Sequence, residues 1–198
     1  MEKNLNKLSS NKYFIPTDKR GSWKTKDSRG HHFDLSLFKT LSWFFSEYNM
    51  NTIVDFGCGT AEYVSRLKDE GIKCEAYDGN PNTPEITKGF GKTLDFSEVV
   101  DLKKRFDCVI SFEVGEHIPQ QYETVFIDNL IRHFDKYLIL SWAVEGQLGD
   151  GHINCRNNDY IIDIMKRRNI RYIEDLSLIF REKATLPWFK NTIMVFTR

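Results

Sequence analysis

Strand-like and helix-like segments alternate along this chain from residue 33 to its carboxyl end. Short runs of branched and aromatic residues, typical of buried strands, are separated by segments whose apolar residues recur at helical spacing. Such alternation predicts parallel βαβ units, with helices on both faces of one sheet. Sheets of this kind bind ligands at the carboxyl ends of their strands. Those ends are therefore where functional residues are expected.

The pattern assigns most of the chain to specific elements. Helices are expected over residues 33–48, 61–70, 97–105, 120–134 and 157–169. Strands are expected over residues 52–56, 72–77, 92–96, 106–114, 136–144 and 191–197. The first 32 residues are polar and are expected to form an arm or lid, which leaves residues 33–198 as a single domain.

Charge and hydropathy argue against several classes of protein. The chain has 28 basic and 28 acidic residues, so no overall positive field attracts nucleic acid or an anionic membrane, although a local basic patch stays open. No run approaches the ~20 apolar residues that cross a bilayer, and the N-terminus lacks the apolar core of a signal peptide. The composition therefore favours a cytoplasmic protein that does not bind membranes, and it disfavours a nucleic-acid partner. Its oligomeric state is not indicated.

A glycine-punctuated turn, DFGCGTAEY, follows the first expected strand. Gly57 and Gly59 allow backbone angles closed to other residues, and the next helix points its N–H groups at a bound ligand. A dinucleotide fingerprint needs a third glycine where this chain has Glu62, and a Walker lysine is also missing. Asp55 opens the turn and favours an ammonium group over a pyrophosphate.

Acidic and aromatic residues end the next two strands. Asp78 ends the second strand, at about the distance where such folds place a carboxylate on ribose hydroxyls. Asp95 and Phe96 end the third strand, where they offer an acceptor for an exocyclic amine and a wall for a purine. The expected ligand is cationic at one end and a nucleoside at the other.

These motifs, VDFGCGTAEY, EAYDGN, TLDF and DCVISFEVGEHIP in this order, resemble the class I S-adenosylmethionine-dependent methyltransferases. The resemblance implies a Rossmann-like, mostly parallel seven-stranded sheet with an antiparallel C-terminal strand. It also implies roles at the cofactor: Asp55, Gly57 and Gly59 at the methionine part, Asp78 at the ribose, Asp95 with Phe96 at the adenine, and the first acid of the fourth strand, Glu113, as a further contact. One departure is Ala61, where the family often has a third glycine.

Titratable groups are dense after the fourth strand. SFEVGEHIP carries Glu113, Glu116 and His117, and His152 lies in a Gly-rich segment after the neighbouring fifth strand. The E-x-x-E-H segment resembles that of methyltransferases that bind a divalent cation, such as small-RNA 3′-end 2′-O-methyltransferases. The resemblance implies Glu113, Glu116, His117 and His152 as ligands of Mg²⁺ or Mn²⁺, since carboxylate and imidazole suit such ions. Many metal-free relatives carry a similar segment, so His117 as a general base and a purely structural turn stay open.

The resulting hypothesis is an S-adenosylmethionine-dependent O-methyltransferase that acts on a small molecule or glycan, with Glu116, His117 and His152 in the chemistry. The neutral charge and the lack of an appended recognition domain favour a small acceptor. The alternatives are an RNA or protein methyltransferase and a non-catalytic cofactor-binding or scaffold protein. His31 and His32 either fold over the site or are merely solvated. Trp142 and Trp188 either line the acceptor pocket or pack in the core.

Overall fold

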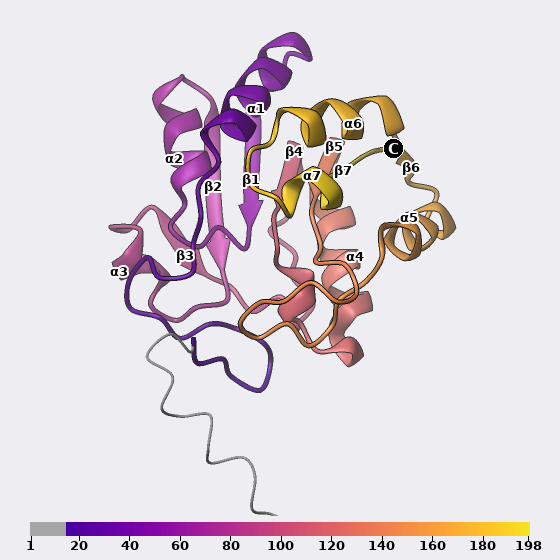
Figure 1. The fold of residues 1–198 in the computed structure, drawn as a ribbon. Helices are drawn as coiled ribbons and strands as arrows, with labels where there is room; N and C mark the ends of the chain where they lie inside the picture. Colours follow the sequence, from indigo (N-terminus) through magenta and orange to yellow (C-terminus); the bar gives the residue numbers. More distant parts are fainter. Residues whose placement is uncertain (1–14) are drawn as a thin grey trace, which may run out of the picture.

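The computed structural model describes residues 15–198, which form one mixed sheet covered by helices (Figure 1). The strand order is β3-β2-β1-β4-β5-β7-β6. The strands are β1 (Thr52–Phe56), β2 (Lys73–Asp78), β3 (Gly91–Thr93), β4 (Phe106–Ser111), β5 (Phe134–Leu140), β6 (Arg171–Tyr172) and β7 (Met194–Thr197). The five strands β1 to β5 pair in parallel, whereas β7 pairs antiparallel with both β5 and β6. The predicted Rossmann-like, seven-stranded sheet is confirmed.

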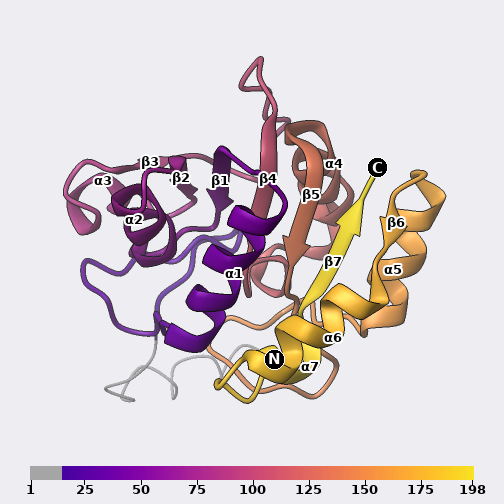
Figure 2. The same cartoon turned by 90° about the horizontal axis from the view of Figure 1, so that it is seen from above.

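Two apolar clusters hold the helices onto the sheet. The helices are α1 (Leu35–Glu47), α2 (Glu62–Asp69), α3 (Thr83–Ile86), α4 (Glu123–His133), α5 (Asn158–Arg167), α6 (Glu174–Lys183) and α7 (Phe189–Thr192). One cluster gathers side chains of α1, α2, α6 and α7, and the other gathers side chains of α4 and α5. Figure 2 shows α1 and α4 on opposite sides of the sheet. Both faces are therefore covered, as the near-continuous apolar strands require.

The predicted helix over residues 97–105 is wrong, because these residues form turns and irregular backbone. Two of their backbone N–H groups donate to side chains of the neighbouring helix α4, and three others donate to Asp95 or Asp101 close by in the sequence. The N–H of Val100 donates to Asn129 Oδ1 at 2.8 Å, and the N–H of Leu102 donates to His133 Nε2 at 3.0 Å. Tertiary hydrogen bonds thus override the helical spacing of the segment.

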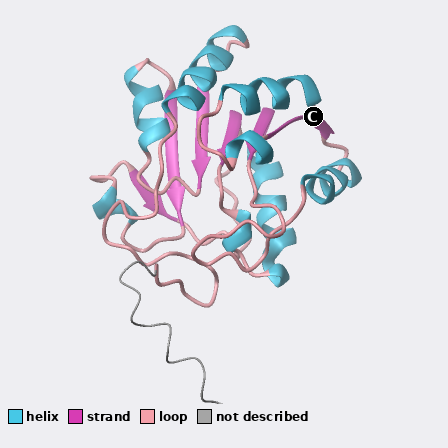
Figure 3. Ribbon diagram, in the orientation of Figure 1, coloured by secondary structure: helices cyan, strands magenta, loops and turns pink. Residues whose placement is uncertain are grey.

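Other boundaries also differ from the sequence-based expectation. The third, fourth and fifth strands end at Thr93, Ser111 and Leu140, earlier than expected, so the residues after them are free to form loops. Helix α6 and the two-residue strand β6 were not predicted. Figure 3 shows the long loops gathered at the end of the sheet where the parallel strands end.

The expected arm is described only in part. Residues 1–14 of the predicted 1–32 segment lie outside the described residues, whereas residues 15–32 run beneath the carboxyl ends of the strands (Figure 1). Within residues 15–198, no helix is both long and apolar enough to cross a bilayer.

Candidate active site

A cavity of about 970 Å³ lies at the carboxyl ends of the strands, and its size is within the range of small-molecule sites. Nine of the ten residues proposed from the sequence line this cavity: Asp55, Gly57, Gly59, Asp78, Asp95, Phe96, Glu113, His117 and His152. The tenth, Glu116, is fully buried beside it. The fold therefore gathers residues from four strand ends and one long loop at a single place.

The glycine turn joins β1 to α2 and forms one wall of the cavity. Gly57 has φ +91°, and a Cβ at this position would clash with Val114, so only glycine fits. The N–H of Gly59 donates to Asp78 Oδ2 at 2.8 Å. Ala61 has φ +57°, a left-handed conformation that glycine adopts at a lower conformational cost than alanine. This explains why a glycine is often found at this position in the family that the sequence resembles.

Two acids of β1 and β2 meet at this turn. Asp55 is 4% exposed, and burial together with the charge of Asp78 raises its pKa well above the usual range. Asp78 is held by the N–H groups of Gly59 and Asn80, each at 2.8 Å. Because Asp55 is buried beside another acid, a cationic group in the cavity would stabilise its ionised form.

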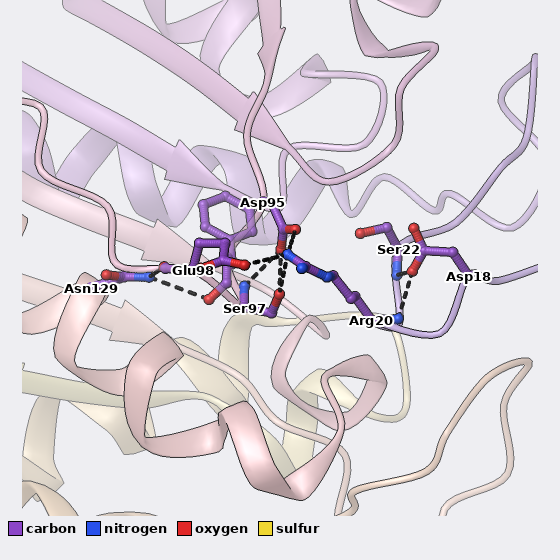
Figure 4. A network of polar contacts seen from close by, with 8 residues as sticks. Asp18, Arg20, Ser22, Asp95, Ser97, Glu98 and Asn129 are labelled. Carbon is purple, nitrogen blue, oxygen red and sulfur yellow. Dashed lines mark hydrogen bonds and ion pairs between the residues drawn. The ribbon is translucent and has the colours of Figure 1, made fainter.

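The loop that follows strand β3 supplies Asp95 and Phe96. Phe96 is 5% exposed and packs against Phe56, so most of its ring belongs to the core. Asp95 Oδ1 accepts hydrogen bonds from the N–H and Oγ of Ser97, and Asp95 Oδ2 pairs with Arg20 at 2.5 Å (Figure 4). Burial raises the pKa of this carboxyl, but the bonds from Ser97 and Arg20 outweigh burial, and the pKa is lowered. Asp95 is therefore ionised at neutral pH.

A second group of titratable residues converges near the residues that the sequence predicts to bind the cofactor. One ligand atom from each of Glu116, His117 and His152 lies within 4.8 Å of the other two. The 3₁₀ turn Gly115–His117 presents the first two, and the loop after β5 presents the third. His152 Nε2 lies 3.9 Å from Glu116 Oε1. The three residues are close enough together that a metal ion could be held by one atom from each.

Glu116 is the most unusual member of the group. It is fully buried, and neither carboxylate oxygen has a hydrogen-bond partner among residues 15–198. Burial and the negative charge of Glu113 raise its pKa well above the usual range. Burial and the nearby His152 lower the pKa of His117 to about 4, so this imidazole is neutral at pH 7. A neutral imidazole is the form that binds a metal ion or accepts a proton.

The structure does not bring Glu113 into this group of three. Its φ is +52°, and its carboxylate accepts hydrogen bonds from Gln147 Nε2 at 2.7 Å and Thr192 Oγ1 at 3.3 Å. Glu113 lines the cavity at the end of β4, so a cofactor contact fits its position better than metal ligation.

The two tryptophans differ in position. Trp142 is fully buried, packs against Gly115 and donates to the carbonyl of Asn154, so it belongs to the core. Trp188 lines the cavity, where His32 packs against it edge-on.

Arm residues are the part of the site that the sequence did not identify. Arg20, Gly21, Ser22 and Trp23 all line the cavity. The other histidine of the pair, His31, lies against Gly59, where it would meet any added Cβ. The polar composition of the arm was the only available signal, and it does not specify which side chains fold inward.

Comparison with known proteins agrees with this geometry. The family model described as "Methyltransferase domain" matches residues 29–141, more than half of the chain. A search of curated proteins found no match.

Solved methyltransferase structures share the fold. The sugar N-methyltransferase KedS8 from Streptoalloteichus sp ATCC 53650 has a TM-score of 0.65 and 12% identity, over 86% of this chain and 90% of its own. A magnesium protoporphyrin IX methyltransferase from Synechocystis PCC 6803, with bound SAH, has a TM-score of 0.61 and 17% identity, over 81% of each chain. The methyltransferase domain of bacterial CtHen1 has a TM-score of 0.57 and 13% identity, over 82% of this chain and 98% of its own. The chain therefore belongs to the methyltransferase domain family and has the fold of the S-adenosylmethionine-dependent enzymes of class I.

Proposed function

We propose that this protein is an S-adenosylmethionine-dependent O-methyltransferase whose acceptor is a small molecule or glycan and whose reaction uses a divalent cation. The observation that carries the proposal is the convergence of Glu116, His117 and His152, of which the two histidines line the cavity that also holds the expected cofactor residues. Methyl donor and acceptor have to meet in one water-poor place, and this cavity offers both sets of groups.

The cofactor residues fit a sulfonium nucleoside. Asp55 offers a buried negative charge to the ammonium of the methionine part, next to the glycine turn that admits a close approach. Asp78 offers a carboxylate to the ribose, and Asp95 with Phe96 offers an acceptor and an aromatic face to the adenine. These three sets follow the neighbouring strands β1, β2 and β3, so their order across the sheet corresponds to the order of the methionine, ribose and adenine parts.

The metal residues fit a divalent cation. A buried carboxylate without a partner is costly, and a cation held by Glu116, His117 and His152 would remove that cost. A bound Mg²⁺ or Mn²⁺ ion would lower the pKa of an acceptor hydroxyl. Trp188, which lines the cavity, would supply an apolar wall for that acceptor.

The small acceptor is supported by what the similar structures act on. One is a sugar N-methyltransferase and another is a magnesium protoporphyrin IX methyltransferase. The neutral charge of this chain agrees with a small acceptor. Methylation of oxygen rather than nitrogen rests on the cation group alone.

Loss of the Asp78 carboxylate should weaken cofactor binding. Isothermal titration with S-adenosylhomocysteine is expected to give a clear Kd for the wild type and a Kd about 10-fold higher for Asp78→Asn, because one charge-assisted hydrogen bond to the ribose is lost. Asp69→Asn, the same change at an exposed position outside the cavity, should leave the Kd unchanged. If the wild type binds neither S-adenosylmethionine nor S-adenosylhomocysteine, the proposed function is wrong.

A further inference from the structure

The described part of the arm, residues 15–32, contacts all three regions assigned to the cofactor. Arg20 pairs with Asp95 at the adenine end. Ser22 lies against Gly79, next to the ribose acid, where an added Cβ would clash with it. His31 lies against Gly59 at the methionine end. Because the cavity lies between the arm and the strand ends, the arm forms its roof.

The tip of the arm is a preformed hairpin, residues 16–24. Its two sides are joined by a bridge between Thr17 and Trp23 and by a hydrogen bond from the N–H of Lys24 to the carbonyl of Pro16. Asp18 Oδ1 accepts hydrogen bonds from the N–H groups of Arg20, at 2.8 Å, and Ser22, at 3.1 Å. The turn therefore holds the backbone of Arg20 in place before its side chain meets the body of the protein.

Gly21 allows this hairpin to pack closely against His117. It has φ +90°, and an added Cβ would overlap the carbonyl oxygen of His117. Trp23 packs edge-on against the His117 ring, with 5.2 Å between ring centroids. The hairpin thus covers the metal group as well as the adenine end.

The hairpin is anchored at its base and held by ion pairs at its tip. At the base, Thr25 is 4% exposed, and its carbonyl accepts hydrogen bonds from the side chains of Asn80, at 3.0 Å, and Asn82, at 2.9 Å. At the tip, one guanidinium nitrogen of Arg20 pairs with Asp95 at 2.5 Å and Glu98 at 2.6 Å (Figure 4). The Arg20 side chain is 34% exposed and that of Glu98 is 63% exposed, so these pairs break more readily than buried ones.

We propose that hairpin 16–24 is a lid over the cofactor and that the ion pairs of Arg20 with Asp95 and Glu98 are its latch. The proposal rests on the proposed function, since it takes S-adenosylmethionine and S-adenosylhomocysteine as the molecules under the lid. Asp95 thereby has two tasks: it accepts from the adenine amine, and it holds the lid that covers the adenine. A carboxylate oxygen has two lone-pair positions, so Asp95 Oδ2 can serve both partners at once. Cofactor entry and product release both require the latch to open.

Stopped-flow mixing with S-adenosylhomocysteine tests the latch. Intrinsic fluorescence is a suitable signal, because Trp23 and Trp188 line the cavity. In Arg20→Gln, the association and dissociation rate constants are both expected to rise about 5-fold, while the Kd changes less than about 3-fold, because the lid delays entry and escape alike. Glu98→Gln, which removes one of the two pairs, should raise both rates about 2-fold.

Arg29→Gln is the matched control. Arg29 pairs with Asp27 on the same arm and does not line the main cavity, so its loss should leave both rates unchanged. Raising the salt concentration from about 50 to about 500 mM should speed exchange in the wild type but not in Arg20→Gln, because salt screens partly exposed ion pairs.

The possible outcomes distinguish failure of the lid proposal from failure of the proposed function. Binding by the wild type with equal rates in Arg20→Gln would overturn the latch and leave the cofactor assignment intact. A Kd that rises more than about 10-fold at an unchanged association rate would make Arg20 a direct binding residue, and it too would overturn the latch. Failure of the wild type to bind S-adenosylhomocysteine would overturn the proposed function itself.

Discussion

Glu116→Gln is expected to weaken Mn²⁺ binding about 100-fold or more. Loss of a group that only supports a metal ligand weakens binding about 10- to 100-fold, and Glu116 would itself be a ligand. The reason is that Glu116 is the one carboxyl in the group it forms with His117 and His152, so it alone can offer a negative charge to the ion. A neutral amide of the same shape keeps the packing and removes the charge that attracts the ion. Isothermal titration or electron paramagnetic resonance of Mn²⁺ measures the change. S-adenosylhomocysteine affinity should stay within about 2-fold, because the two sets of residues are separate.

Glu145→Gln is the control for this substitution, since Glu145 is an exposed acid on the same loop as His152. It should bind Mn²⁺ as the wild type does. The apo form of Glu116→Gln is expected to be at least as stable as the wild type, because an unpartnered buried carboxylate is replaced by a neutral group. Equal Mn²⁺ affinity in wild type and variant would contradict the metal site. Activity that survives a chelator and is lost in His117→Ala would then favour His117 as a metal-free base.

Asp34→Ala is expected to lower the free energy of unfolding by about 3 kcal/mol, because it leaves four backbone donors without their acceptor. Asp34 is 1% exposed, and its two oxygens serve different parts of the chain. Oδ1 caps helix α1 through the N–H groups of Ser36 and Leu37, both at 3.0 Å. Oδ2 accepts from the N–H groups of Thr185 and Leu186 at 2.6 and 2.8 Å. Urea unfolding monitored by circular dichroism measures the loss.

Asp34→Asn should fall between the wild type and Asp34→Ala. Its amide oxygen can still cap α1, but its NH₂ group would face two N–H donors. The effect should also depend on pH. Burial raises the pKa of Asp34, but its hydrogen bonds outweigh burial and lower the pKa, so its contribution is present above the unfolded value of about 3.9 and is lost as pH falls through the folded value. A difference between wild type and Asp34→Ala that is constant from pH 7 to about pH 3 would contradict this account.

The sequence predicted the sheet well where burial decides the pattern. The strand cores around Val54, Val109 and Leu138 are continuous apolar runs because both faces of the sheet are covered, and that signal is local. It failed at residues 97–105, where Asn129 and His133, about 30 residues away, accept hydrogen bonds from two of the backbone N–H groups. No local pattern reports a partner that only the fold brings close.

The same distinction between local sequence patterns and tertiary contacts applies to the site. Asp55, Gly57, Gly59, Asp78, Asp95 and Phe96 could be proposed from the sequence because each stands at a strand end, and parallel strands bring their carboxyl ends to one edge. Glu113 and Glu116 look equivalent in the sequence. In the structure the left-handed backbone at Glu113 turns its carboxylate toward Gln147, whereas the 3₁₀ turn buries that of Glu116.

The sequence by itself therefore determined the sheet, the family and the strand-end residues, since periodicity and turn chemistry are properties of neighbouring residues. Only the tertiary structure decided which acid faces the two histidines, and it alone placed Arg20 on Asp95 across 75 positions of the chain. The physical reason is that an ion pair or a metal site depends on distances of a few ångströms between side chains. Those distances are set by the packing of loops onto the finished sheet.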